Sequence, residues 1–193
     1  RDSEVWNKVK SLFQEMICLK NNSGEKSLRV WSAGCANGEE PYTIAIKLKN
    51  LLKTDSLNFR AEIIATDVDN KSLKLAERGR YSKDALKNVS ERYLGKYFDF
   101  IEGEYRVKDE LKKMVSFKYL DLTSQELVEN ADVVFCRNVF IYFDRSLQEQ
   151  LLMKFYKALK PDGFLIMGKA ETLVSEAKSI FEEIDFNARL YRK

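Results

Sequence analysis

Short apolar runs alternate with segments of helical periodicity along most of this sequence. Helices are expected over residues 1–20, after Pro41 and around residues 147–155. Strands are expected over residues 28–33, 61–67, 115–121, 132–138 and 164–168, the last after a turn at KPDG. Strands that alternate with helices form parallel sheets. The sequence therefore predicts an α/β fold with a doubly wound, mostly parallel sheet.

The alternation is interrupted between Tyr81 and Leu111. This stretch begins with a helical pattern and continues as two short strands that meet at Glu102-Gly103. We expect one domain over residues 1–193, with a small antiparallel β insertion at about residues 81–111. The tail has the composition for one or two further strands.

The sequence contains no histidine. Ser-His and Cys-His catalysis, acid–base catalysis by imidazole and histidine zinc sites are thereby excluded, and no metal is expected. Three widely spaced cysteines argue for a reducing, cytoplasmic location. The formal net charge of +3 comes from scattered basic residues, which do not predict nucleic-acid binding. No apolar run reaches the length needed for membrane insertion.

The segment RVWSAGCANGEEPYTIAI, residues 29–46, leads from a predicted strand into a predicted helix through a turn of small residues. Gly34 and Gly38 allow the backbone to approach a ligand closely, although a tight structural turn explains them equally well. Glu39 and Glu40 lie at the start of the helix, where the positive end of the helix dipole favours carboxylates. A carboxylate there suits an amine or a sulfonium better than a phosphate.

Polar groups also follow three other strands, at Asp67, Asp121 and Arg137-Asn138. Ligands of doubly wound sheets bind outside the carboxyl ends of the strands, so these groups are expected to share a site with the glycine turn. Each is compatible with a loop role by itself, and their occurrence at four successive strand ends favours binding. NAD fits poorly, because its pyrophosphate avoids carboxylates and the GxGxxG fingerprint is absent. A nucleoside with a cation and no phosphate, S-adenosylmethionine, is the predicted ligand, with Asp67 accepting from the ribose hydroxyls.

Four segments resemble the CheR chemotaxis protein-glutamate O-methyltransferases. They are residues 29–46, ATDVDNKSLKLAERGRYS at 65–82, FCRNVFIYFD at 135–144 and LKPDGFLIMG at 159–168. The resemblance follows the order of the family over nearly the whole chain. It implies a fold of the class I S-adenosylmethionine-dependent methyltransferase type. It also implies methyl transfer to glutamates in the cytoplasmic helical region of chemoreceptors, with S-adenosylhomocysteine as the product.

The resemblance also implies site residues, position by position. The family's acidic contact matches Glu40 and its ribose-binding aspartate matches Asp67. The residues expected to bind the cofactor are Gly34, Glu40, Asp67, Asp121, Leu122, Arg137 and Asn138. Tyr142 matches the tyrosine near the methyl group. Arg1 matches an arginine that lines the family's site, and we expect it to orient the substrate carboxylate.

The chain departs from the family pattern in three places. The family's GHSE motif reads GKAE here, at residues 168–171. Its N-terminal helical domain is expected to be absent. The segment DFIEGEYRV, residues 99–107, is shorter than in members that grip a receptor tail peptide, so such a tether is not expected.

The predicted chemistry needs few catalytic groups. A glutamate substrate is already ionised at pH 7, because its reference pKa is about 4.3, so no general base is required. Two alternatives stay open at this point. One is a methyltransferase of the same fold that acts on another protein or a small molecule, and the other is an S-adenosylmethionine-binding module without turnover.

Overall fold

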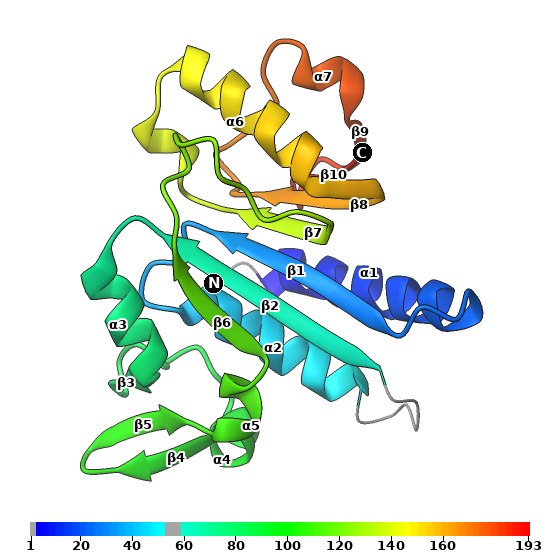
Figure 1. The fold of residues 1–193 in the computed structure, drawn as a ribbon. Helices are drawn as coiled ribbons and strands as arrows, with labels where there is room; N and C mark the ends of the chain where they lie inside the picture. Colours follow the sequence, from blue (N-terminus) through cyan, green and yellow to red (C-terminus); the bar gives the residue numbers. More distant parts are fainter. Residues whose placement is uncertain (1–2, 53–58) are drawn as a thin grey trace.

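The computed structural model describes residues 3–52 and 59–193. Within this part of the chain, seven strands form one sheet in the order β6-β2-β1-β7-β8-β10-β9 (Figure 1). They are β1 (Ser27–Ala33), β2 (Arg60–Asp67), β6 (Val115–Tyr119), β7 (Ala131–Cys136), β8 (Leu159–Met167), β9 (Glu182–Asp185) and β10 (Leu190–Arg192). The first five in this order run parallel, and β10 is antiparallel to both of its neighbours. The predicted doubly wound, mostly parallel sheet is confirmed, including two strands from the tail.

Helices cover both faces of the sheet (Figure 1). On one face lie α1 (Ser3–Asn22), α2 (Glu39–Leu52) and α3 (Asn70–Arg78), and on the other lie α6 (Arg145–Ala158) and the short α7 (Ala177–Ile180). The side chains of β1 show how the faces are filled. Leu28 and Val30 pack into the core beneath α1 and α2, whereas Trp31 and Ala33 pack into the core beneath α6. A strand buried on both faces reads as an almost continuous apolar run, which is why β1 was predictable.

Helix α3 is capped at both ends. Asp69 is its N-cap and accepts a hydrogen bond from the backbone N–H of Lys71 at 2.9 Å. Gly79 ends the helix in the left-handed conformation, with φ of 59°, and donates its N–H to the carbonyl of Leu75. Helix α3 therefore starts three residues after the end of β2, which fixes the loop that carries Asp67.

The small antiparallel insertion is also confirmed. Strands β3 (Arg80–Tyr81), β4 (Phe98–Ile101) and β5 (Glu104–Val107) form a second sheet in the order β3-β5-β4, with helix α4 (Glu91–Tyr97) before β4. Helix α5 (Asp109–Lys112) returns the chain to β6. In Figure 1 this small sheet lies at the foot of the molecule, below α3 and far from α6. It is therefore an appendage on the β6 side of the main sheet.

One predicted turn is placed differently in the structure. Residues 160–163 are expected to form a turn before the last core strand, and the structure places this turn within the bounds of β8, as a bulge in which Asp162 has a φ of 59°. Leu159 pairs with Ala131 and Phe164 pairs with Val133, so the bulge stands opposite Asp132 alone. The ammonium of Lys160, in the bulge, lies 3.1 Å from the carboxylate of Asp132, the buried residue that the bulge stands opposite.

Candidate functional site

The four strand ends singled out by the sequence lie next to one another. Strands β6, β2, β1 and β7 are consecutive neighbours in the sheet and run parallel, so their carboxyl ends form one edge. The chain leaves β1 toward β2 on one side and returns by way of β6 to β7 on the other. The β1–β7 junction is therefore the topological switch point at which doubly wound sheets bind ligands.

The glycine turn after β1 is shaped by the protein around it. Gly34 has a φ of 77°, and a Cβ there would lie 2.5 Å from the Val139 side chain. Gly38 has a φ of 91°, and a Cβ there would lie 2.9 Å from the Cβ of Ala76. The N–H of Gly34 donates to the carbonyl of Thr66 on β2 at 2.8 Å. Close packing against other protein atoms thus explains both glycines, in agreement with the tight structural turn that the sequence allowed as an alternative.

The Asp67 carboxylate joins the glycine turn to the end of β2. Its Oδ2 accepts the backbone N–H of Ala36 at 2.8 Å, and its Oδ1 accepts the backbone N–H of Asp69 at 2.9 Å. The side chain is half-buried. Because each carboxylate oxygen can accept two hydrogen bonds, both oxygens keep the capacity to accept a hydroxyl from a ligand.

Glu40 lies in the first turn of α2, with its carboxylate turned toward β1 and β7. Ser32 donates its hydroxyl to Oε1 at 2.8 Å, and Nη1 of Arg137 lies 3.8 Å from Oε2. The Glu40 and Arg137 side chains are 18% and 10% exposed. Burial raises the pKa of Glu40 to about 7, although the Ser32 hydrogen bond and Arg137 act to lower it. Glu39 is exposed, so the structure separates the two glutamates that the sequence presented together.

The loop after β6 lies beside Asp67. The N–H of Leu120 donates to the carbonyl of Asp67 at 3.1 Å. Asp121 accepts hydrogen bonds from the backbone N–H and the hydroxyl of Thr123, both at 2.8 Å, and these bonds lower its pKa. Leu122 is buried, and its carbonyl accepts the ammonium of Lys154 at 2.9 Å. The Asp121 carboxylate therefore stabilises its own loop.

The turn after β7 exposes the predicted tyrosine. Asn138 adopts a left-handed conformation with a φ of 61°, and a short 3-10 helix, η1 (Phe140–Tyr142), follows. Phe140 packs into the core, whereas Ile141 and Tyr142 are 59% and 78% exposed. Tyr142 is thus placed at the carboxyl edge and is directed outward.

Sequence reasoning assigned no role to Glu171, the last residue of the GKAE segment. This carboxylate is 4% exposed and accepts four backbone N–H groups. The donors are Asn138 at 3.0 Å, Val139 at 2.8 Å, Phe140 at 2.8 Å and Gly168 at 2.6 Å. The sequence did indicate that this glutamate occupies the last position of a family motif. Nothing in the sequence indicated that its partners are backbone N–H groups of the turn after β7.

The predicted residues fall into three groups. Glu40 contacts Arg137 directly, Gly34 and Asp67 belong to the joined ends of β1 and β2, and the loops that carry Asp121-Leu122 and Asn138-Tyr142 follow the neighbouring strands. Arg1 lies outside the described residues.

Burial raises the pKa of the Cys35 thiol, in the glycine turn, to about 12, so a reactive thiolate at this edge is excluded.

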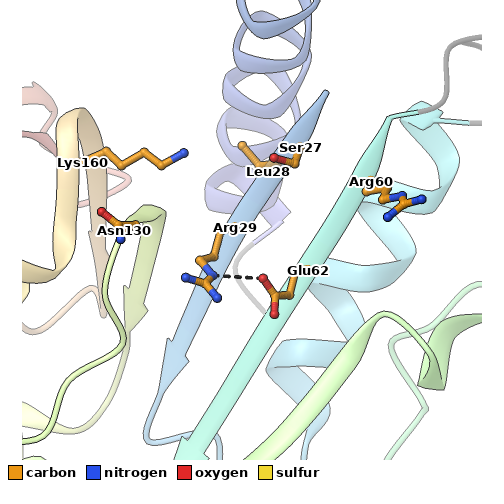
Figure 2. A pocket seen from close by; sticks show the side chains of 7 residues that line it. All are labelled: Ser27, Leu28, Arg29, Arg60, Glu62, Asn130 and Lys160. Carbon is orange, nitrogen blue, oxygen red and sulfur yellow. Dashed lines mark hydrogen bonds and ion pairs between the residues drawn. The ribbon is translucent and has the colours of Figure 1, made fainter. Parts of the chain in front are cut away.

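A hollow of about 430 Å³ opens at the opposite edge of the sheet, where strands β1, β2 and β8 begin (Figure 2). Arg29 and Glu62 form an ion pair across it at 2.9 Å, and Arg60 and Lys160 also line it. Among the residues that the structure describes, none of those predicted for the site lines this hollow. The carboxyl edge therefore remains the candidate site.

Comparison with known proteins identifies relatives along most of the chain. A protein-family model described as the CheR methyltransferase, SAM binding domain, matches residues 1–189. A chemotaxis protein methyltransferase of Borreliella burgdorferi is 39% identical over 170 residues, which cover 86% of this chain and 59% of the relative. A chemotaxis protein methyltransferase of Escherichia coli is 40% identical over 158 residues, which cover 79% of this chain and 54% of the relative. A probable chemotaxis protein methyltransferase of Rhizobium etli is 34% identical over 169 residues, which cover 85% of this chain and 63% of the relative. The chain thus spans between 54% and 63% of the length of these curated relatives.

Proposed function

The chain belongs to the family of CheR methyltransferase SAM-binding domains, and on that premise we propose that it transfers methyl groups from S-adenosylmethionine to glutamate side chains of chemoreceptors. The products are glutamyl methyl esters and S-adenosylhomocysteine. The names of the relatives, chemotaxis protein methyltransferases, support this substrate class. Methylation of the helical receptor region places the reaction in the cytoplasm.

One observation carries the cofactor assignment in this chain. Glu40 is a buried carboxyl at the switch point, and burial raises its pKa to about 7. A cationic ligand favours the ionised form of such a group. The two Asp67 oxygens, held in place by backbone amides, are suited to ribose hydroxyls. These residues fit a nucleoside that bears a positive charge.

The chain's residues act mainly by positioning in this proposal. Bound S-adenosylmethionine supplies an activated methyl group. The substrate glutamate is ionised at neutral pH, so no residue of the chain has to remove a proton. Glu40, Asp67 and the loops on either side hold the cofactor, and Tyr142 projects from the edge toward an incoming protein surface. Alignment of reacting groups by such contacts can lower a barrier by roughly 7–11 kcal/mol.

A transfer assay with a chemistry readout tests the proposal. The protein is incubated with methyl-labelled S-adenosylmethionine and a receptor cytoplasmic fragment, and the labelled fragment is then treated with alkali. Carboxyl methyl esters release labelled methanol, whereas N-methyl groups do not. We expect release of methanol, and loss of labelling when the methylated glutamates are replaced by alanine. Alkali-stable label would indicate a different acceptor, and cofactor binding without any transfer would indicate a binding module.

A further inference from the structure

The turn that bears Asn138 and Tyr142 is held by a single buried carboxylate. Oε1 of Glu171 accepts the N–H groups of Val139 and Phe140, both at 2.8 Å. Oε2 accepts the N–H of Asn138 at 3.0 Å, together with the N–H of Gly168 at 2.6 Å. Three consecutive N–H groups of the turn after β7 thus converge on one side chain that lies 31–33 positions further along the chain.

The other end of the same turn is also held by a side chain. Nε2 of Gln148, on α6, donates to the carbonyls of Phe140 and Phe143, each at 3.0 Å. The N–H of Tyr142 donates to the carbonyl of Val139 at 3.2 Å. The backbone of this exposed turn is therefore bonded to the core on both sides, although two of its side chains face solvent.

The outward side chains of the turn do not contribute to this anchoring. Ile141 is 59% and Tyr142 is 78% exposed, and large apolar side chains at that exposure contribute little to folding. A turn fixed this firmly beneath exposed side chains is the arrangement expected where a site must present groups to a partner at a defined place.

We propose that Glu171 is a positioning residue of the methyl-transfer site, which fixes the Asn138–Tyr142 turn so that Asn138 meets the cofactor and Tyr142 meets the substrate. This inference rests on the proposed function, because the roles of Asn138 and Tyr142 do. It gives a function to the glycine and to the glutamate of the GKAE segment. Gly168 is needed because a Cβ there would lie 2.6 Å from Oε2 of Glu171 and 2.9 Å from the N–H nitrogen of Asn138.

Two substitutions disturb the carboxylate in different ways. In Glu171→Gln the side chain keeps its size, but its amide NH₂ must face two backbone donors whichever way it is turned. In Gly168→Ala the charge is unchanged, and the added methyl group pushes the carboxylate away from its donors. Glu176→Gln is the matched control, because Glu176 is exposed and lies only five positions after Glu171. If Glu171→Gln fails to fold, Gly168→Ala tests the same contact.

Amide hydrogen exchange and cofactor binding test the inference without turnover. We expect exchange at residues 138, 139 and 140 to accelerate by about tenfold or more in Glu171→Gln, while exchange in β1 and β2 stays as in the Glu176→Gln control. We expect the Kd for S-adenosylhomocysteine to rise about fivefold or more. Unchanged protection of these three amides, or an affinity equal to that of the control, would overturn the inference.

Methyl transfer tests the connection to Tyr142. We expect kcat at saturating cofactor to fall about tenfold or more in Glu171→Gln, the scale of loss that follows from a misplaced reacting group. In a Tyr142→Phe background the same substitution should cost about threefold or less, because both changes act on one side chain. An equal loss in both backgrounds would refute positioning through Tyr142. If Glu171→Gln shows the predicted changes in exchange and binding but the wild type transfers no methyl group to receptors, the proposed function fails and the anchoring role of Glu171 stands.

Discussion

Binding of S-adenosylmethionine is expected to be coupled to the ionisation of Glu40. Burial raises the pKa of this carboxyl to about 7, the nearby charge of Glu171 acts in the same direction, and Ser32 and Arg137 oppose it. A cationic ligand binds the ionised form, so the apparent Kd rises as the ionised fraction falls. With a pKa of about 7, that fraction is about 0.76 at pH 7.5 and about 0.03 at pH 5.5. The affinity should therefore weaken about 25-fold across this range.

The stability of the ligand-free protein should change in the opposite direction. The pKa of Glu40 is raised on folding from 4.5 to about 7, so the folded state binds more protons than the unfolded state within that window. The contribution of Glu40 to stability is therefore fully present below pH 4.5 and is lost as the pH rises through about 7. The shift corresponds to about 3 kcal/mol of the free energy of unfolding, lost between these two pH values.

Titration calorimetry at several pH values between about 5.5 and 7.5 measures the first effect. The sulfonium of the ligand carries no titratable proton, so its positive charge is the same at every pH in this range. Glu40→Gln should give an affinity that is nearly independent of pH and no better than that of the wild type at pH 5.5. Glu39→Gln is the matched control, because this neighbouring glutamate is exposed, and it should keep the wild-type profile. A flat wild-type profile, or a slope that survives in Glu40→Gln, would refute the reasoning.

Three further substitutions test the rest of the edge. Asp67→Ala should weaken binding of S-adenosylmethionine by roughly 1.5–3 kcal/mol, the range for hydrogen bonds to a charged group, and calorimetry that finds unchanged affinity in a folded variant would contradict the ribose assignment. Tyr142→Phe should lower kcat while the Kd for the cofactor stays within about threefold, because the exposed tyrosine serves methyl transfer more than cofactor binding. A large loss of cofactor affinity with normal turnover per bound cofactor would show that the tyrosine serves binding instead. Gly34→Ala should lower the free energy of unfolding by about 1 kcal/mol or more, because the residue has a φ of 77° and its Cβ would lie 2.5 Å from the Val139 side chain. In urea titrations, adding Val139→Ala to this variant should restore part of the lost stability.

The fold was predictable because its signals are local. The burial of β1 on both faces produces a continuous apolar run, and the cap residues Asp69 and Gly79 mark both ends of α3. The convergence of Glu40 and Asp67 was predictable for a related reason. Once a parallel sheet is inferred, the ends of neighbouring strands must meet at one edge. The roles given to these residues, and to Asn138, stay predictions.

The bulge at residues 160–163 shows where local signals fail. The KPDG segment has the composition of a turn, and nothing within it reveals that Asp132, on another strand, holds Lys160 at 3.1 Å. The bounds of the strand include this segment because Leu159 before it and Phe164 after it both pair with β7. The segment keeps its local preference for a turn, with a φ of 59° at Asp162, and only the tertiary pairing that places this turn inside a strand has no signal along the chain.

The same reason hid the connection between the glycine turn and the GKAE segment. Val139 packs its side chain where a Cβ of Gly34 would stand, and it donates its N–H to Glu171 at 2.8 Å. Glu171 in turn leaves no room for a side chain at Gly168. Three segments that are far apart in the sequence thus meet at Val139. A valine does not by itself indicate such a contact. A substitution in the GKAE segment that moves Val139 must also move the turn that bears Gly34, so the two motifs are constrained together by packing, and neither can be interpreted from its own residues alone.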